Sequence, residues 1–164
     1  MHIRPTTEDD WALLKAVRLA ALLDAPAAFG VSHGTAAAYT EAQWRERAAP
    51  GGTAFWLAFD EGGAPAGMVG GAVDRQGHYN LIGMWMRHDQ RGTGMARRLV
   101  DAVKAHAVEG GHRRVVLDVA PDNARAACFY LNQGFFFLDE WEALESHPHI
   151  RVQKMAWQAE TLPD

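Results

Sequence analysis

The chain has 164 residues, a length that suits one domain with its own hydrophobic core, so we expect a single domain over residues 1–164. A net charge of −4, a pI near 6.0 and scattered arginines argue against a nucleic-acid-binding protein. No apolar run reaches the ~20 residues of a membrane span, the N-terminus lacks the apolar core of a signal peptide, and Cys128 is the single cysteine. We therefore expect a cytoplasmic protein with no membrane contact, no disulfide and no cysteine-bound zinc.

The first third of the chain predicts a short edge strand followed by two helices. Residues 1–4 are predicted to form the strand, which Pro5 ends, and Thr7 with the three acids after it indicates a helix start. Residues 27–40 are small and irregular, and residues 41–49 predict a second, shorter helix. The first helix shows its helical spacing at Trp11, Leu14, Val17, Arg18, Ala21 and Leu22.

Three strands are predicted next, over residues 53–59, 66–74 and 79–86, separated by turns at 60–63 and 75–78. Gly83 lies inside the third of these strands. A glycine there indicates either a β-bulge or the close approach of a large neighbouring side chain.

A glycine-bearing loop, Arg91-Gly92-Thr93-Gly94-Met95-Ala96, separates that strand from an amphipathic helix. The first N–H groups of a helix lack intrahelical partners, and glycines let a ligand approach the backbone, so the loop predicts a cradle for phosphate or pyrophosphate. The alternative is a tight turn whose glycines serve only their φ angles. The Lys-Ser/Thr pair of a P-loop is missing, and Arg97 occupies the third glycine position of a Rossmann turn.

The last third predicts a strand over 113–119, a helix over 123–132, and a closing hairpin of strands 135–142 and 151–157. A long loop through His147-Pro148-His149 is expected to join the two hairpin strands. Its histidines are interpreted as solvated side chains, and we expect no metal site. The succession of elements predicts a mixed α+β fold in which about seven strands form one sheet covered by about four helices.

Two blocks of sequence resemble the GNAT superfamily of acetyl-CoA-dependent N-acetyltransferases. Arg91-x-x-Gly94-x-Ala96 matches its Q/R-x-x-G-x-G/A pattern. Residues 115–135, with Asn123, Phe129-Tyr130 and Gly134-Phe135, match the strand and helix that follow. The resemblance implies a mostly antiparallel GNAT-type sheet and direct acetyl transfer from acetyl-CoA to a primary amine of a small molecule or peptide. By analogy with relatives, it also suggests a homodimer.

The resemblance also implies site residues. The pyrophosphate would bind backbone N–H groups of Gly92, Thr93, Gly94, Met95 and Ala96 with help from Arg91, and the pantetheine arm would bind backbone groups of Met84 and Met86 and the side chain of Asn123. Tyr130 would act as general acid toward the leaving thiolate, since a phenol with a reference pKa of ~10 is protonated at neutral pH. The aromatic residues Trp11, Phe29 and Trp44 are candidates for the wall of the acceptor pocket.

The general base is the least defined part of this prediction. Asn80 occupies the position where many relatives carry a glutamate, and an amide cannot accept the proton. Candidate bases are His78, Asp118, Glu142, His147 and His149, with a water relay as the alternative. The missing carboxylate leaves open a non-catalytic acyl-CoA-binding module or sensor, and a Rossmann-type nucleotide-binding protein is a third reading.

Overall fold

The computed structural model describes residues 1–26, 31–144 and 146–160, and these form a seven-stranded sheet in the order β1-β2-β3-β4-β5-β7-β6. Neighbouring strands are antiparallel except for β4 and β5, which are parallel. The predicted mixed α+β class is confirmed, and the sheet differs from the parallel sheet of a Rossmann fold. The strands are β1 (His2–Pro5), β2 (Ala54–Phe59), β3 (Pro65–Val73), β4 (Tyr79–Met86), β5 (Arg114–Val119), β6 (Phe136–Leu144) and β7 (His147–Gln158).

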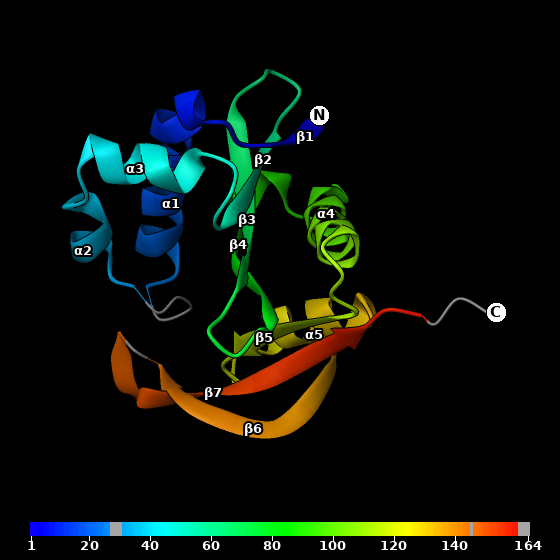
Figure 1. The fold of residues 1–164 in the computed structure, drawn as a ribbon. Helices are drawn as coiled ribbons and strands as arrows, with labels where there is room; N and C mark the ends of the chain where they lie inside the picture. The colour runs from blue at the N-terminus through cyan, green and yellow to red at the C-terminus, as the bar shows by residue number, and fades with distance from the viewer. Residues whose placement is uncertain (27–30, 145, 161–164) are drawn as a thin grey trace.

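Helices cover both faces of the sheet (Figure 1). Three of them, α1 (Trp11–Asp24), α2 (His33–Ala37) and α3 (Glu41–Ala48), lie on one face, and α4 (Met95–Glu109) and α5 (Ala124–Asn132) lie on the other. Short 3-10 turns precede α1 (η1, Glu8–Asp10) and α4 (η2, His88–Gln90). No helix in the described ranges is long and apolar enough to cross a bilayer.

The alternation of side chains along each strand divides the core into two clusters. In β2, Leu57 and Phe59 pack with α1, whereas Trp56 and Ala58 pack with α4. Because both faces are covered, the sheet holds helices of the first and second halves of the chain at fixed positions relative to β4.

The start of the first helix is fixed by polar contacts as well as by packing. Thr7 and Asp10 form a capping box, in agreement with the predicted helix start. Arg4 donates to both carboxylate oxygens of Asp10, at 2.6 and 2.8 Å, and thereby ties β1 to η1. These hydrogen bonds lower the pKa of Asp10 to about 2.

A β-bulge in β4 opens the sheet at its centre. Register partners run from Met68↔Trp85 to Gly70↔Ile82, so two β4 residues, Gly83 and Met84, face one residue of β3. Gly83 has a φ of +61°, in the left-handed region that favours glycine. The predicted bulge is therefore confirmed. The alternative also holds, because a Cβ on Gly83 would lie 3.2 Å from Nη1 of Arg18.

β4 and β5 diverge on the other side of this bulge. Their parallel pairing consists of Tyr79↔Val115 and Asn80↔Val116 and ends there. The edge of β4 that faces β5 is consequently unpaired from Leu81 onward within the described ladder, which leaves a gap between two strands of one sheet.

Two local predictions were wrong. Residues 33–37, expected to be irregular, form α2, because Ser32 caps the helix by accepting from the N–H of Thr35. The expected long loop through His147 is strand instead: β7 begins at that residue and pairs with β6 at Leu144↔His147. The strand tolerates Pro148 because β5 reaches β7 only from Gln153 onward and the β6 register jumps from His147 to Arg151, so Pro148 has no register partner on either side.

Candidate active site

The gap between β4 and β5 joins two cavities. One, of about 410 Å³, extends toward the glycine loop and is lined by Gly92 and Ala96; we call it the loop cavity. The other, of about 520 Å³, opens on the α1 face and is lined by Asp118 and Glu142; we call it the carboxylate cavity. Both are lined by Met84, Asn123, Ala126 and Tyr130, so these four residues surround the passage between them.

The glycine loop presents unpaired backbone donors. Gly92 and Gly94 adopt φ angles of +82° and +87°, and a Cβ on either would meet nothing within 4 Å. Among the described residues, none of the N–H groups from Gly92 to Ala96 donates a backbone hydrogen bond. These N–H groups lie at the start of the 15-residue α4, where the helix dipole is positive. Free N–H groups at the positive end of a helix commonly bind anionic phosphate groups.

Arg91 is held in place by protein groups. Its Nε donates to the carbonyl of Met86 at 3.0 Å, and its Nη2 donates to Oδ2 of Asp24 at 3.0 Å. Asp24 also accepts from Nε1 of Trp85 at 2.9 Å and contacts His88 Nε2 at 3.0 Å. The hydrogen bond from Trp85 is the main reason that the pKa of Asp24 is lowered. This carboxylate thus ties the end of α1 to β4 and to the glycine loop, a role that its sequence position did not indicate.

Tyr130 lies on α5 with its ring against Phe129 and Phe135, at centroid distances of 5.2 and 5.6 Å. It is 8% exposed, and burial raises the pKa of its hydroxyl above the ordinary value. No hydrogen bond links this hydroxyl to another group in the described part of the chain. A protonated phenol is therefore available on the wall shared by the two cavities.

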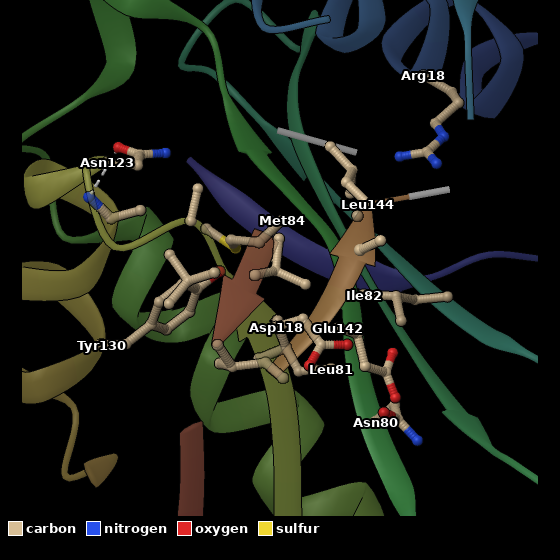
Figure 2. Close-up of a pocket in the computed structure, with 17 residues that line it drawn as sticks. Arg18, Asn80, Leu81, Ile82, Met84, Asp118, Asn123, Tyr130, Glu142 and Leu144 are labelled. Carbon is tan, nitrogen blue, oxygen red and sulfur yellow. Dashed lines mark hydrogen bonds between the residues drawn. The ribbon is translucent and has the colours of Figure 1, made fainter. Parts of the chain in front are cut away.

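Two asparagines line the carboxylate cavity, and Figure 2 shows them at opposite ends of it, with Asn123 on the side of Tyr130. Asn123 is the N-cap of α5, and its Oδ1 accepts from the N–H of Ala126 at 3.3 Å, so its amide NH₂ remains available. Asn80 uses its NH₂ on Oδ2 of Asp74 at 3.0 Å and on the carbonyl of His78 at 3.1 Å. Asn80 is thus oriented by the neighbouring turn and offers only a carbonyl oxygen to the cavity.

Two of the five candidate bases line the carboxylate cavity. Asp118 forms an ion pair with Lys154 at 3.4 Å, whereas Glu142, on β6, has no ion pair or hydrogen bond within the described ranges. The candidate histidines lie outside the cavity lining: His78 near Asp74, and His147 and His149 against each other on β7. In the described residues, no cluster of three or more metal-ligating side chains occurs.

The cavities gather most, but not all, of the residues that the sequence suggested. Thr93, Gly94 and Met95 do not line the loop cavity, and the Met95 side chain is buried in the core at 1% exposure. Thr93 donates its hydroxyl to the carbonyl of Gln90 at 2.7 Å. Phe29 lies outside the described residues. The predicted cofactor residues that do line the loop cavity are Met84, Met86, Arg91, Gly92, Ala96 and Asn123.

Arg18 is a cavity residue that sequence reasoning missed. It extends from α1 into the carboxylate cavity, where Figure 2 shows it on the opposite side from Tyr130. Burial lowers the pKa of its guanidinium. A signal for it existed, because Arg18 falls on the same helical stripe as Leu14, Val17 and Ala21, where a charged residue is unexpected.

This geometry suits transfer of a group between two ligands that enter from opposite sides of the sheet. Unpaired amides at the loop can hold a phosphorylated ligand, the unpaired edge of β4 can hydrogen-bond an extended arm, and the acids of the far cavity attract a cation. Tyr130 is placed where either ligand would reach it.

Comparisons with known proteins agree with this arrangement. Residues 19–135 match the family model described as the acetyltransferase (GNAT) family. A curated relative, the L-2,4-diaminobutyric acid acetyltransferase of Chromohalobacter salexigens, is 31% identical over 142 residues, which make up 85% of this chain. The match spans 65% of the length of that relative.

Solved structures of low sequence identity share the fold. An acetyltransferase of the GNAT family from Streptococcus pneumoniae superposes with a TM-score of 0.78 at 20% identity, covering 97% of this chain and 99% of that one. A putative acetyltransferase from Salmonella typhimurium, solved with its cofactor acetyl-CoA, gives a TM-score of 0.74 at 18% identity, covering 100% and 98%.

Proposed function

Because the chain belongs to the GNAT family of acetyltransferases, as its two sequence blocks predicted, we propose that it transfers an acetyl group from acetyl-CoA directly to a primary amine. The observation that carries this proposal is the passage between β4 and β5. It connects a cavity with unpaired loop amides to a cavity with two carboxylates, and Tyr130 belongs to the wall of both.

Acetyl-CoA supplies the acetyl group as an activated thioester, and the residues around the loop cavity fit its parts. The amides from Gly92 to Ala96 would bind the pyrophosphate, and Arg91, fixed by Asp24, would hold the loop in the shape that presents them. Backbone groups of β4 near Met84, left without register partners by the bulge, would bind the pantetheine arm together with the Asn123 amide.

Three proton movements are needed at the passage: the ammonium loses one proton before attack, the departing thiolate gains one, and the nitrogen of the tetrahedral intermediate loses a second one, which restores the Tyr130 hydroxyl. Tyr130 would donate its hydroxyl proton to the departing thiolate, a role that its raised pKa permits because the hydroxyl stays protonated throughout the physiological range. The ammonium of the acceptor must lose a proton before it can attack. Glu142 would receive that proton, directly or through one water, because it is the cavity carboxylate that no described cation neutralises.

A measurement of thiol release from acetyl-CoA tests the proposal. Purified protein is incubated with acetyl-CoA and a panel of polyamines, amino acids, aminoglycosides and short peptides, including the 2,4-diaminobutyrate named for the curated relative. We expect amine-dependent thiol release and an N-acetylated product by mass spectrometry. Tight binding of acetyl-CoA without thiol release for any amine would instead favour the non-catalytic module or sensor.

A further inference from the structure

A third cavity adjoins the carboxylate cavity beneath α1 and α3. Its volume is about 170 Å³, and it shares Arg18, Ile82 and Gly83 with the larger cavity. Of the twelve described residues that line it, the two charged ones, Arg18 and Arg47, are both cations. We call it the arginine chamber. Its charge is opposite to that of the carboxylate cavity, where Asp118 and Glu142 outnumber the shared arginine.

A buried donor without a partner lies in the same chamber. Trp44 lines it and is 2% exposed, and its indole Nε1–H has no hydrogen-bond acceptor among the described residues. Buried polar groups in proteins are almost always hydrogen-bonded, so this donor requires an acceptor beyond the described residues, such as a water molecule or a ligand. A ligand oxygen in the chamber would provide it.

The two arginines are positioned by different neighbours. The guanidinium of Arg47 lies over the ring of Tyr39, 4.0 Å from its centroid, which fixes this cation at the chamber wall. Arg18 reaches the bulge of β4, where its Nη1 is close enough to Gly83 that a Cβ there would lie 3.2 Å away. Arg47 is therefore a partly exposed cation of α3 at the chamber wall, and Arg18 lies at the boundary with the carboxylate cavity, close to β4.

From these observations we propose that the arginine chamber binds the carboxylate of the acceptor, with Arg18 as the main charged partner and Trp44 Nε1 as a neutral donor. The acceptor is then an amino acid whose ammonium group faces Asp118 and Glu142. The chamber has room for a carboxylate and its first carbon atoms, since a water molecule needs only about 30 Å³. This inference rests on the proposed acetyltransferase function and names its substrate class.

The opposite charges of the arginine chamber and the carboxylate cavity explain why amino acids are favoured over simple polyamines as acceptors. A simple polyamine would satisfy the acids but would bring a cation or a methylene toward Arg18 and Arg47. An amino acid carries an anion to the arginines and a cation to the acids, so both ends gain charge-assisted contacts. A diamino acid additionally places a second ammonium on the acidic side.

Pairs of acceptors that differ only in the carboxylate test the proposal. Ornithine is compared with putrescine, lysine with cadaverine, and 2,4-diaminobutyrate with 1,3-diaminopropane, using the full chain and saturating acetyl-CoA. We expect kcat/KM for the carboxylate-bearing member of the best pair to be higher by about a hundredfold or more, since a site built to bind a polar group discriminates strongly against its absence.

Variants test which residues cause the preference for the carboxylate-bearing acceptor. In Arg18→Met, which keeps the length of the side chain, we expect the ratio of kcat/KM values within the best pair to fall at least about tenfold, mainly through KM for the amino acid. Trp44→Phe keeps an aromatic ring without the N–H and should reduce the ratio by a smaller factor. Arg45→Met, on α3 next to Trp44, is the matched control. Arg45 pairs with Glu8, Asp9 and Glu41 and lines none of the three cavities.

The outcomes separate this inference from the proposed function. Acetylation of both members of every pair with similar kcat/KM would overturn the carboxylate assignment and leave the acetyltransferase proposal intact. The absence of thiol release with every amine would overturn both. If Arg18→Met fails to fold, the comparison within pairs in the unmodified chain and the Trp44→Phe ratio still decide the question.

Discussion

Replacing Tyr130 by phenylalanine isolates the proposed general acid. The ring contacts with Phe129 and Phe135 are retained, and no described group loses a hydrogen bond, so the free energy of unfolding should change by less than about 1 kcal/mol. General acids accelerate reactions on the order of 10²–10⁴-fold. Water in the open carboxylate cavity can replace part of this effect, so we expect kcat to fall at least about tenfold, or about 1.4 kcal/mol in activation free energy.

The assay is steady-state thiol release with the best amine of the panel, accompanied by calorimetric titration of CoA. The CoA dissociation constant should remain within about twofold of the unmodified value, because the loop amides are untouched. Tyr79→Phe is the matched control, since its hydroxyl bonds Nδ1 of His106 at 2.7 Å and Tyr79 lines none of the cavities. An unchanged kcat in Tyr130→Phe, or an equal loss in Tyr79→Phe, would remove Tyr130 from the mechanism.

Three further predictions concern the loop, the cavity acid and the helix start. Gly94→Ala puts a Cβ at a φ of +87°, and the free loop would relieve this strain by moving its amides out of place. Binding of CoA must then restore roughly 1 kcal/mol of strain, so the affinity measured by calorimetry should fall about fivefold, whereas Gly77→Ala in a remote turn, at +83°, should leave it unchanged. Glu142→Gln should lower kcat/KM at neutral pH about tenfold in the thiol-release assay. Glu140→Gln, outside the cavity lining, should behave like the unmodified protein, and equal effects of the two would refute the base assignment. The pKa of Asp10 in the folded state is lowered to about 2, so its ionised carboxylate contributes about 2 kcal/mol to the free energy of unfolding. This contribution is present above pH 4 and is lost as the pH falls through 2. Urea unfolding of Asp10→Asn should therefore show that loss at pH 7 and a vanishing difference below pH 2; a constant difference across this range would contradict the ion-pair origin.

Much of the fold could be predicted because its signals are local. The apolar and aromatic run over residues 79–86, the helical stripe that follows the glycine loop and the glycines at 92 and 94 each specify their own segment. The errors arose where local signals are weak. α2 has five small or polar residues with little hydrophobic periodicity, and the first residues of β7 include a proline that usually marks a loop.

The sequence by itself determined the family, the glycine loop before α4 and the place of Tyr130 on its helix, since each depends on residue types at short spacing. Only the tertiary structure decided which charged side chains line the two cavities on either side of the passage. Arg18, Asp24, Asp118 and Glu142 are far apart in the chain and come together because β4 separates from β5 at the centre of the sheet while α1 packs across one face. The physical reason is that side-chain periodicity fixes which face of an element is buried, whereas strand order and helix placement fix what that face meets.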